Sequence, residues 1–98
     1  SGMRINEPAA DLGIALVVAS SFKNISIPKD IAVIGEVGLT GEIRSVNLID
    51  KRLKEIERLG FKRCIIPENN KKLLKNKYNL DIIGVRNIND ALRAVEIK

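Results

Sequence analysis

The second half of the sequence alternates short apolar runs with amphipathic segments, and this order constrains the fold more than any other feature. The runs at residues 62–66 and 80–85 are rich in Ile and predict two buried strands. A helical pattern follows each of them, at residues 67–75 and 87–95, and a further helix is predicted at residues 47–59. Strands that alternate with helices pair in parallel, so this half predicts an α/β fold.

The first half adds a helix and a hairpin. Pro8 suits the first position of a helix that extends to Phe22. Apolar side chains cover nearly every face of this helix, which is typical of a helix buried on several sides or packed on a neighbouring subunit. The β-branched run at residues 31–37 predicts a core strand, which Gly38 to Gly41 turn back into a strand at residues 42–46.

These elements predict one mixed sheet with helices packed on it, in a single domain of 98 residues. The first helix starts close to residue 1, so we interpret residues 1–98 as a domain excised from a longer protein that supplies a further edge strand. Ser1-Gly2 are compatible with a cloning remnant.

Polar residues and a glycine mark the expected helix ends. Asn47 and Asn87 are predicted N-caps, and each has an aspartate three residues later, Asp50 and Asp90, in a variant of the capping box. Gly60 is the predicted stop of the helix that begins near Asn47.

Several function classes are excluded by what the sequence lacks. It contains no His, so neither a Ser-His-Asp relay nor a His-ligated zinc site can form. The one cysteine, Cys64, lies in an apolar run and is interpreted as a core residue in a reducing compartment, the cytoplasm. No apolar stretch approaches the ~20 residues that span a bilayer. Aromatic residues make up only 3%, too few for a base-stacking platform.

The net charge of +5 is concentrated in one segment, residues 51–77, which holds ten basic and three acidic side chains. Lys51, Lys54 and Arg58 are spaced i, i+3 and i+7, so they share one helix face. Long cationic side chains in a stripe suit contact with phosphates and no particular base sequence. The alternative is a solvated surface with a weak Lys51–Glu55 pair. The candidate phosphate contacts are Lys51, Lys54, Arg58, Lys62, Arg63, Lys71, Lys72 and Lys75.

Two acidic residues stand out in apolar surroundings. Asp11 fits the first turn of its helix, where a carboxylate interacts well with the helix dipole, and an intersubunit pair with Arg44 is the alternative. Glu36 lies in a core strand, where a carboxylate needs a partner, so we expect a strand end, a basic contact or a subunit neighbour.

Several short motifs together resemble one known family. They are Asn6-Glu7-Pro8-Ala9-Ala10-Asp11-Leu12, the run from Gly35 to Arg44, Leu59-Gly60-Phe61-Lys62-Arg63 and Ile65-Ile66-Pro67-Glu68-Asn69-Asn70. In this order and spacing they resemble the C-terminal domain of the RadA (Sms) family of bacterial DNA repair proteins. That domain is similar to the proteolytic domain of Lon, within the ribosomal protein S5 domain 2-like fold.

The resemblance to Lon allows its Ser-Lys dyad to be sought in this chain. The position of the nucleophilic serine is Ala9, directly after Pro8, and the position of the general-base lysine is Asp50. Lys51 lies one residue later, about 100° around the helix. Ala9 has no hydroxyl to deprotonate, so we expect no peptidase activity. A rearranged dyad of Ser45 with Lys51 is a minor alternative, and solvated roles explain Ser20, Ser21 and Ser26.

The resemblance implies a non-catalytic Lon-like domain of a DNA-dependent ATPase that promotes branch migration. The domain would serve as an oligomerisation platform, in a hexameric ring, and as a nonspecific surface for single- or double-stranded DNA. No cofactor and no membrane are expected for this domain itself. The resemblance implies that the parent protein binds ATP, Mg and Zn in its other parts. This chain has no P-loop of its own. The alternatives are a Lon-type Ser-Lys peptidase and an S5-like RNA-binding module.

Overall fold

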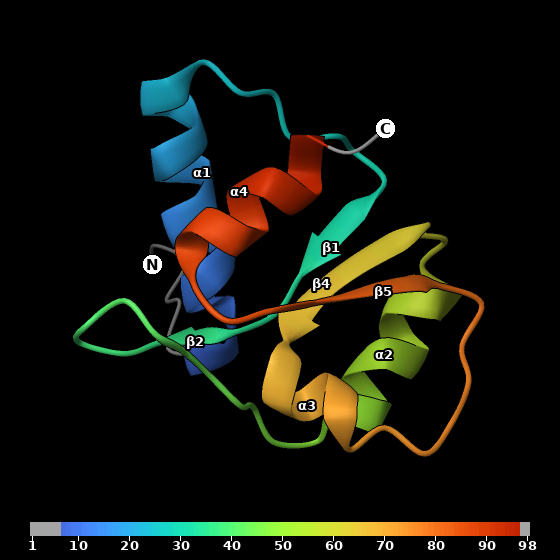
Figure 1. The fold of residues 1–98 in the computed structure, drawn as a ribbon. Coiled ribbons are helices and arrows are strands. Elements are labelled where there is room, and N and C mark those ends of the chain that lie inside the picture. Colours follow the sequence, from blue (N-terminus) through green and yellow to red (C-terminus); the bar gives the residue numbers. More distant parts are fainter. Residues whose placement is uncertain (1–6, 97–98) are drawn as a thin grey trace, which may run out of the picture.

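Three parallel strands form the central sheet of the computed structural model, which describes residues 7–96. They are β1 (Ile31–Val33), β4 (Arg63–Pro67) and β5 (Asp81–Val85), in the order β1-β4-β5 with β4 in the centre (Figure 1). Ala32 is paired with Cys64, and Cys64 in turn with Ile82. The parallel pairing expected from alternating strands and helices is therefore confirmed. The interpretation of Ser1-Gly2 lies outside the described residues.

Helices cover both faces of this sheet (Figure 1). On one face lie α1 (Asp11–Lys23), entered through a short 3-10 helix at Pro8–Ala10, and α4 (Ile88–Glu96). On the other lie α2 (Ile49–Arg58) and α3 (Glu68–Lys72). The alternation of side chains along β4 divides the core accordingly: Ile65 packs with Leu12 and Leu16, whereas Cys64 and Ile66 pack with Leu53.

The hairpin is a separate sheet, which corrects the expectation of one mixed sheet. β2 (Glu36–Val37) pairs antiparallel with β3 (Ile43–Arg44) and with no strand of the parallel sheet. The apolar run at residues 31–37 is therefore two strands. It breaks at Gly35, whose N–H donates to Ala9 O and whose carbonyl accepts from Leu12 N–H, both at 2.9 Å.

Close packing makes glycine necessary at this break. A Cβ on Gly35 would lie 2.9 Å from Leu12 Cδ2 and 3.2 Å from Ile43 Cγ2. The backbone of the chain can turn away from β4 here because the start of α1 supplies the hydrogen bonds that a neighbouring strand would otherwise make.

Two of the three predicted helix ends are confirmed. Gly60 follows α2 with φ +90°, and Asn87 Oδ1 accepts the N–H of Asp90 at 2.8 Å. The prediction for Asn47 is wrong. Leu48 is the residue before α2, in a left-handed conformation with φ 56°, and Asn47 Oδ1 accepts from Arg52 instead. The buried position predicted for Cys64 is confirmed.

Within residues 7–96, no helix is long and apolar enough to cross a membrane.

Candidate nucleic-acid interface

The outer face of α2 carries the predicted basic stripe. Lys51, Lys54 and Arg58 are all exposed, on the side of the helix opposite the fully buried Leu53. Glu55 lies among them, and its carboxylate accepts from Arg58 Nε at 3.0 Å. This hydrogen bond lowers the pKa of Glu55 and raises that of Arg58. Because Arg58 is matched by an acid, the unmatched charge of the stripe comes from the two lysines.

Arginines and lysines behave differently over the whole described part of the chain. All five ion pairs within residues 7–96 are made by arginines, and no lysine there lies within ion-pair distance of a carboxylate. The weak Lys51–Glu55 pair that would mark an ordinary solvated surface is therefore not formed. The exposed ammonium groups stay available to a solute anion.

A second group of lysines follows β4, on α3 and the loop after it. Its members are all exposed: Lys71, Lys72, Lys75 and Lys77. Leu74 and Tyr78, from the same stretch, pack into the core cluster of Leu53, so this group lies on the same side of the sheet as α2. We name the exposed lysines of this layer the lysine face: Lys51, Lys54, Lys71, Lys72, Lys75 and Lys77.

Asp50 holds the two parts of the lysine face together. It accepts hydrogen bonds from the Tyr78 hydroxyl and from Asn76 Nδ2, the latter at 3.2 Å. The Tyr78 bond is the main reason why the pKa of Asp50 is lowered; Asn76 and the charge of Lys54 act in the same direction. Glu57 also accepts the backbone N–H of Asn79. The loop at residues 76–79 is thereby held against α2.

The last two candidates lie at the other end of α2, at the start of β4. Lys62 is exposed, but the Arg63 side chain is only 16% exposed and forms a 3.0 Å ion pair with Asp30. Arg63 thus differs from the other seven candidates, because its guanidinium joins β4 to the residue that precedes β1.

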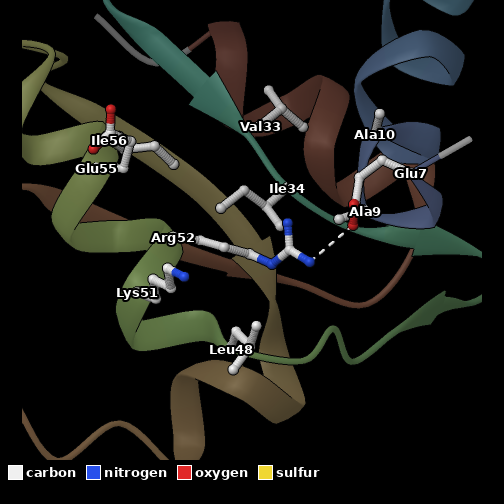
Figure 2. A pocket seen from close by; sticks show the side chains of 10 residues that line it. All are labelled: Glu7, Ala9, Ala10, Val33, Ile34, Leu48, Lys51, Arg52, Glu55 and Ile56. Carbon is white, nitrogen blue, oxygen red and sulfur yellow. Dashed lines mark hydrogen bonds and ion pairs between the residues drawn. The ribbon is translucent and has the colours of Figure 1, made fainter. Parts of the chain in front are cut away.

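Ala9 and Asp50, the two positions matched to a Ser-Lys dyad, do not line a common pocket. Ala9 is buried at the floor of a pocket of about 560 Å³ (Figure 2), whereas Asp50 faces Tyr78 and is not among its lining residues. Lys51 and Arg52 line this pocket instead.

Arg52 crosses the mouth of the pocket. Its guanidinium is 2.8 Å from Glu7 Oε1 (Figure 2). The same guanidinium is 2.9 Å from Asn47 Oδ1, and Arg52 Nε donates to Asn47 O at 2.8 Å. The Arg52–Glu7 ion pair is not predicted from the sequence, because no local signal links two residues 45 positions apart.

Two of the serines, Ser45 and Ser20, lie in different surroundings. Ser45 is exposed in an adjoining cavity of about 500 Å³ lined by Ala9, Glu36 and Arg52, and Lys51 is not part of that lining. The solvated role expected for Ser20 is wrong: Ser20 is buried, and its hydroxyl donates to Val17 O at 2.9 Å. In residues 7–96, no group of three or more acidic or cysteine side chains could hold a metal ion.

The two unusual acidic residues have structural positions. Asp11 lies in the first turn of α1, and its Oδ2 accepts the N–H of Val37 at 3.4 Å. Arg44, its proposed intersubunit partner, forms an ion pair with Glu42 of the same chain at 3.2 Å. Glu36 is half-buried at the start of β2, opposite Arg44 in the hairpin.

Comparisons with known proteins agree with the motifs. A family model described as subunit ChlI of Mg-chelatase matches residues 1–70. DNA repair protein RadA of Halalkalibacterium halodurans is 50% identical over 91 residues, which are 93% of this chain and 20% of the relative. RadA of Bacillus subtilis is 46% identical over 92 residues, 94% of this chain and 20% of the relative.

RadA of Aquifex aeolicus is 54% identical over 68 residues, 69% of this chain and 15% of the relative. The chain thus spans about a fifth or less of the length of these curated relatives. The resemblance to RadA is confirmed, and the chain belongs to the family described as subunit ChlI of Mg-chelatase, with DNA repair proteins RadA among its relatives.

Proposed function

We propose that this chain is a non-catalytic, Lon-like domain of a DNA repair ATPase, and that it contacts DNA through the lysine face. The observation that carries the proposal is a contrast within residues 7–96: five of the six arginines there form ion pairs, all except Arg86, whereas no lysine does. Each unpaired ammonium that meets a phosphate releases a condensed counterion, so the contact gains affinity without reading sequence.

The same domain is proposed as an oligomerisation platform, through an apolar stripe on α1. Ile14, Val18 and Phe22 are spaced i, i+4 and i+8 and are 46, 53 and 88% exposed. A stripe of large apolar side chains on a helix is typical of a protein–protein contact. α1 and the lysine face lie on opposite sides of the sheet, so subunit contact and DNA contact would not compete for one surface.

In a hexameric ring, six copies of the domain would contact the same DNA, so the ring would bind DNA more tightly than one copy does. Such binding suits a hexamer that promotes branch migration. ATP, Mg and Zn would be held by other parts of the longer protein. The proposal places that protein in the cytoplasm, where Cys64 would stay reduced.

A pair of matched variants tests the DNA contact. Lys51→Glu/Lys54→Glu reverses two charges on the lysine face, and Lys23→Glu/Lys29→Glu reverses two exposed charges outside it. Binding is followed by fluorescence anisotropy with labelled duplex and single-stranded oligonucleotides of mixed sequence, over a range of salt concentrations.

We expect the first variant to lose about tenfold or more in affinity for every sequence, and its slope of log affinity against log salt to flatten by about two. The second should change affinity less than threefold. Equal losses in both variants, or an unchanged salt slope in the first, would show that the lysine face is only a solvated surface.

The oligomerisation platform has its own test. Val18→Lys places a charge in the middle of the apolar stripe and should reduce the mass of the assembled protein in sedimentation. Lys23→Glu, which changes an exposed charge on the other side of the same helix, should not. An unchanged mass for Val18→Lys would remove α1 from the subunit interface.

A further inference from the structure

The turn of the hairpin presents a fully exposed leucine. Leu39 lies in the turn Gly38–Gly41 between β2 and β3, and no part of its side chain is buried. Figure 1 shows this turn projecting away from the helices and the parallel sheet. Turn positions favour Gly, Pro, Asn, Asp and Ser, each for a backbone or hydrogen-bonding reason. A large apolar side chain adds nothing to such a turn, so the fold of the chain does not explain Leu39.

Glu42 holds this turn in one conformation. Its Oε1 accepts from Thr40 N–H at 3.1 Å and from the Thr40 hydroxyl, and its Oε2 is 3.2 Å from the Arg44 guanidinium. The backbone closes the same turn, since Gly38 N–H donates to Glu42 O at 2.8 Å and Gly41 N–H donates to Gly38 O at 3.0 Å. The Thr40 hydroxyl is the main reason why the pKa of Glu42 is lowered to about 2. A loop that is already ordered loses little conformational freedom when it binds a partner.

A ring needs two different contact surfaces on every copy. A surface that meets the same surface of a second copy closes a dimer, whereas a ring forms when two unlike surfaces meet head to tail. The apolar stripe on α1 supplies one such surface. A hexameric ring therefore requires a second surface elsewhere on the domain.

The hairpin turn is the best placed second surface within residues 7–96. The large apolar side chains that are exposed there lie on α1, at Leu39, or beside α2 and α3; the last group is Leu48, Leu59 and Leu73. That group adjoins the lysine face, which is assigned to DNA, so Leu39 remains. Figure 1 shows the turn well away from the C-terminal end of α1, so one copy can present its turn and its stripe to different neighbours.

We propose, in a step that rests on the oligomerisation platform described above, that Leu39 of one copy packs on the apolar stripe of the next copy. The stripe consists of Ile14, Val18 and Phe22, and the turn Gly38–Gly41 holds no ionisable side chain. Contact between the two surfaces removes apolar area from water without desolvating a charge.

An exchange of charges tests this contact in the longer protein that contains the chain, by sedimentation over a range of concentrations. Leu39→Glu should weaken self-association at least about tenfold, and Val18→Lys should do the same from the other side of the interface. In the double variant Leu39→Glu/Val18→Lys, every interface joins one glutamate to one lysine. Its self-association should therefore be at least about fivefold stronger than that of either single variant.

Leu73→Glu is the matched control, because it makes the same substitution at another exposed leucine, next to α3. It should leave the mass of the assembled protein unchanged. Leu39→Glu should keep the circular dichroism spectrum of the wild type, since the side chain of Leu39 has no buried surface.

A photo-crosslink identifies the partner of the turn. Leu39→p-benzoylphenylalanine is irradiated in a mixture of isotope-labelled and unlabelled copies of the longer protein, and the linked peptides are identified by mass spectrometry. The expected links join labelled to unlabelled chains and lie in residues 11–23.

The proposal is overturned by a double variant that assembles no better than the single variants, or by links from position 39 to another segment or within one chain. An unchanged mass for Leu39→Glu, beside a reduced mass for Val18→Lys, would overturn this contact alone and leave the apolar stripe as an interface. An unchanged mass for Val18→Lys would remove the stripe itself, and the oligomerisation platform would fail together with this contact.

Discussion

Asn70 pairs with Val46 through two hydrogen bonds, as a neighbouring strand would. Its Oδ1 accepts from Val46 N–H at 2.9 Å, and its Nδ2 donates to Val46 O at 3.0 Å. Asn70 is buried in α3, whereas Val46 lies in the connection from the hairpin to α2. One carboxamide thus holds three elements that no backbone ladder joins.

We expect Asn70→Ala to be strongly destabilising, because both backbone groups of Val46 lose their partner in a partly buried place. The free energy of unfolding should fall by about 1–3 kcal/mol in urea titrations. Asn69→Ala, at the exposed neighbouring position, should change it by less than about 0.5 kcal/mol. Similar values for the two variants would contradict the role given to Asn70.

The same substitution at two glycines should have opposite effects. Gly13→Ala should raise the free energy of unfolding by up to about 1 kcal/mol, since Gly13 is inside α1 and its nearest neighbours are 4.0 Å away. Gly35→Ala should lower it by about 1–3 kcal/mol, because Leu12 and Ile43 leave no room for a methyl group. Thermal or urea unfolding measures both. A stabilising Gly35→Ala would show that the packing there is loose.

Acid should loosen the loop at residues 76–79 through Asp50. The pKa of Asp50 is lowered in the folded state, mainly by the Tyr78 hydroxyl. A carboxylate with a lowered pKa contributes stability that is complete above its unfolded pKa, near 3.8, and is lost as the pH falls through the folded value. Between pH 5 and pH 2, wild type should therefore lose more stability than Asp50→Asn.

Urea midpoints at several pH values measure this difference. Tyr78→Phe removes the main hydrogen bond and should give a pH dependence between those of wild type and Asp50→Asn. Parallel curves for wild type and Asp50→Asn would mean that the carboxylate is not held by its partners.

The Cys64 thiol should be inert in the native protein. It is fully buried, and burial raises its pKa to about 12, so almost no thiolate exists at pH 8. Reaction with a thiol-specific disulfide reagent should occur only after unfolding, at least a hundred times more slowly than in urea-unfolded protein. Rapid native-state labelling would contradict the position of Cys64 in the core.

Most helices and strands could be predicted from local patterns. The spacing of apolar residues, the helix stop at Gly60 and the N-cap at Asn87 each depend only on residues close in the sequence. They could not predict that the run at residues 31–37 is two strands. Its composition is continuous, and the break at Gly35 depends on hydrogen bonds from Ala9 and Leu12, more than twenty residues away. The start of α2 differs from the prediction for a similar reason. Arg52 donates hydrogen bonds to the side-chain and backbone oxygens of Asn47, so Asn47 does not cap the helix and Leu48 is the residue before it.

The candidate site was predictable only in part. Helical spacing was sufficient to bring Lys51, Lys54 and Arg58 to one exposed face. Which cations remain unpaired depends on tertiary contacts, such as that of Arg63 with Asp30, and on rotamer choice, such as that of Arg58 with Glu55. The spacing of Glu55 and Arg58, three residues apart on one helix, allows their pair to be expected from the sequence, whereas nothing local links Arg63 with Asp30.

The central position of β4 has a consequence for how this domain forms. β1 and β5 each pair with β4 and never with one another, so no part of the parallel sheet can exist until residues 63–67 have been made. During synthesis, α1 and β1 must wait for about thirty further residues before their partner appears. A nascent chain that stalls before residue 63 would hold the hairpin but no sheet to bury Leu12 and Leu16, which makes it a natural target for chaperones.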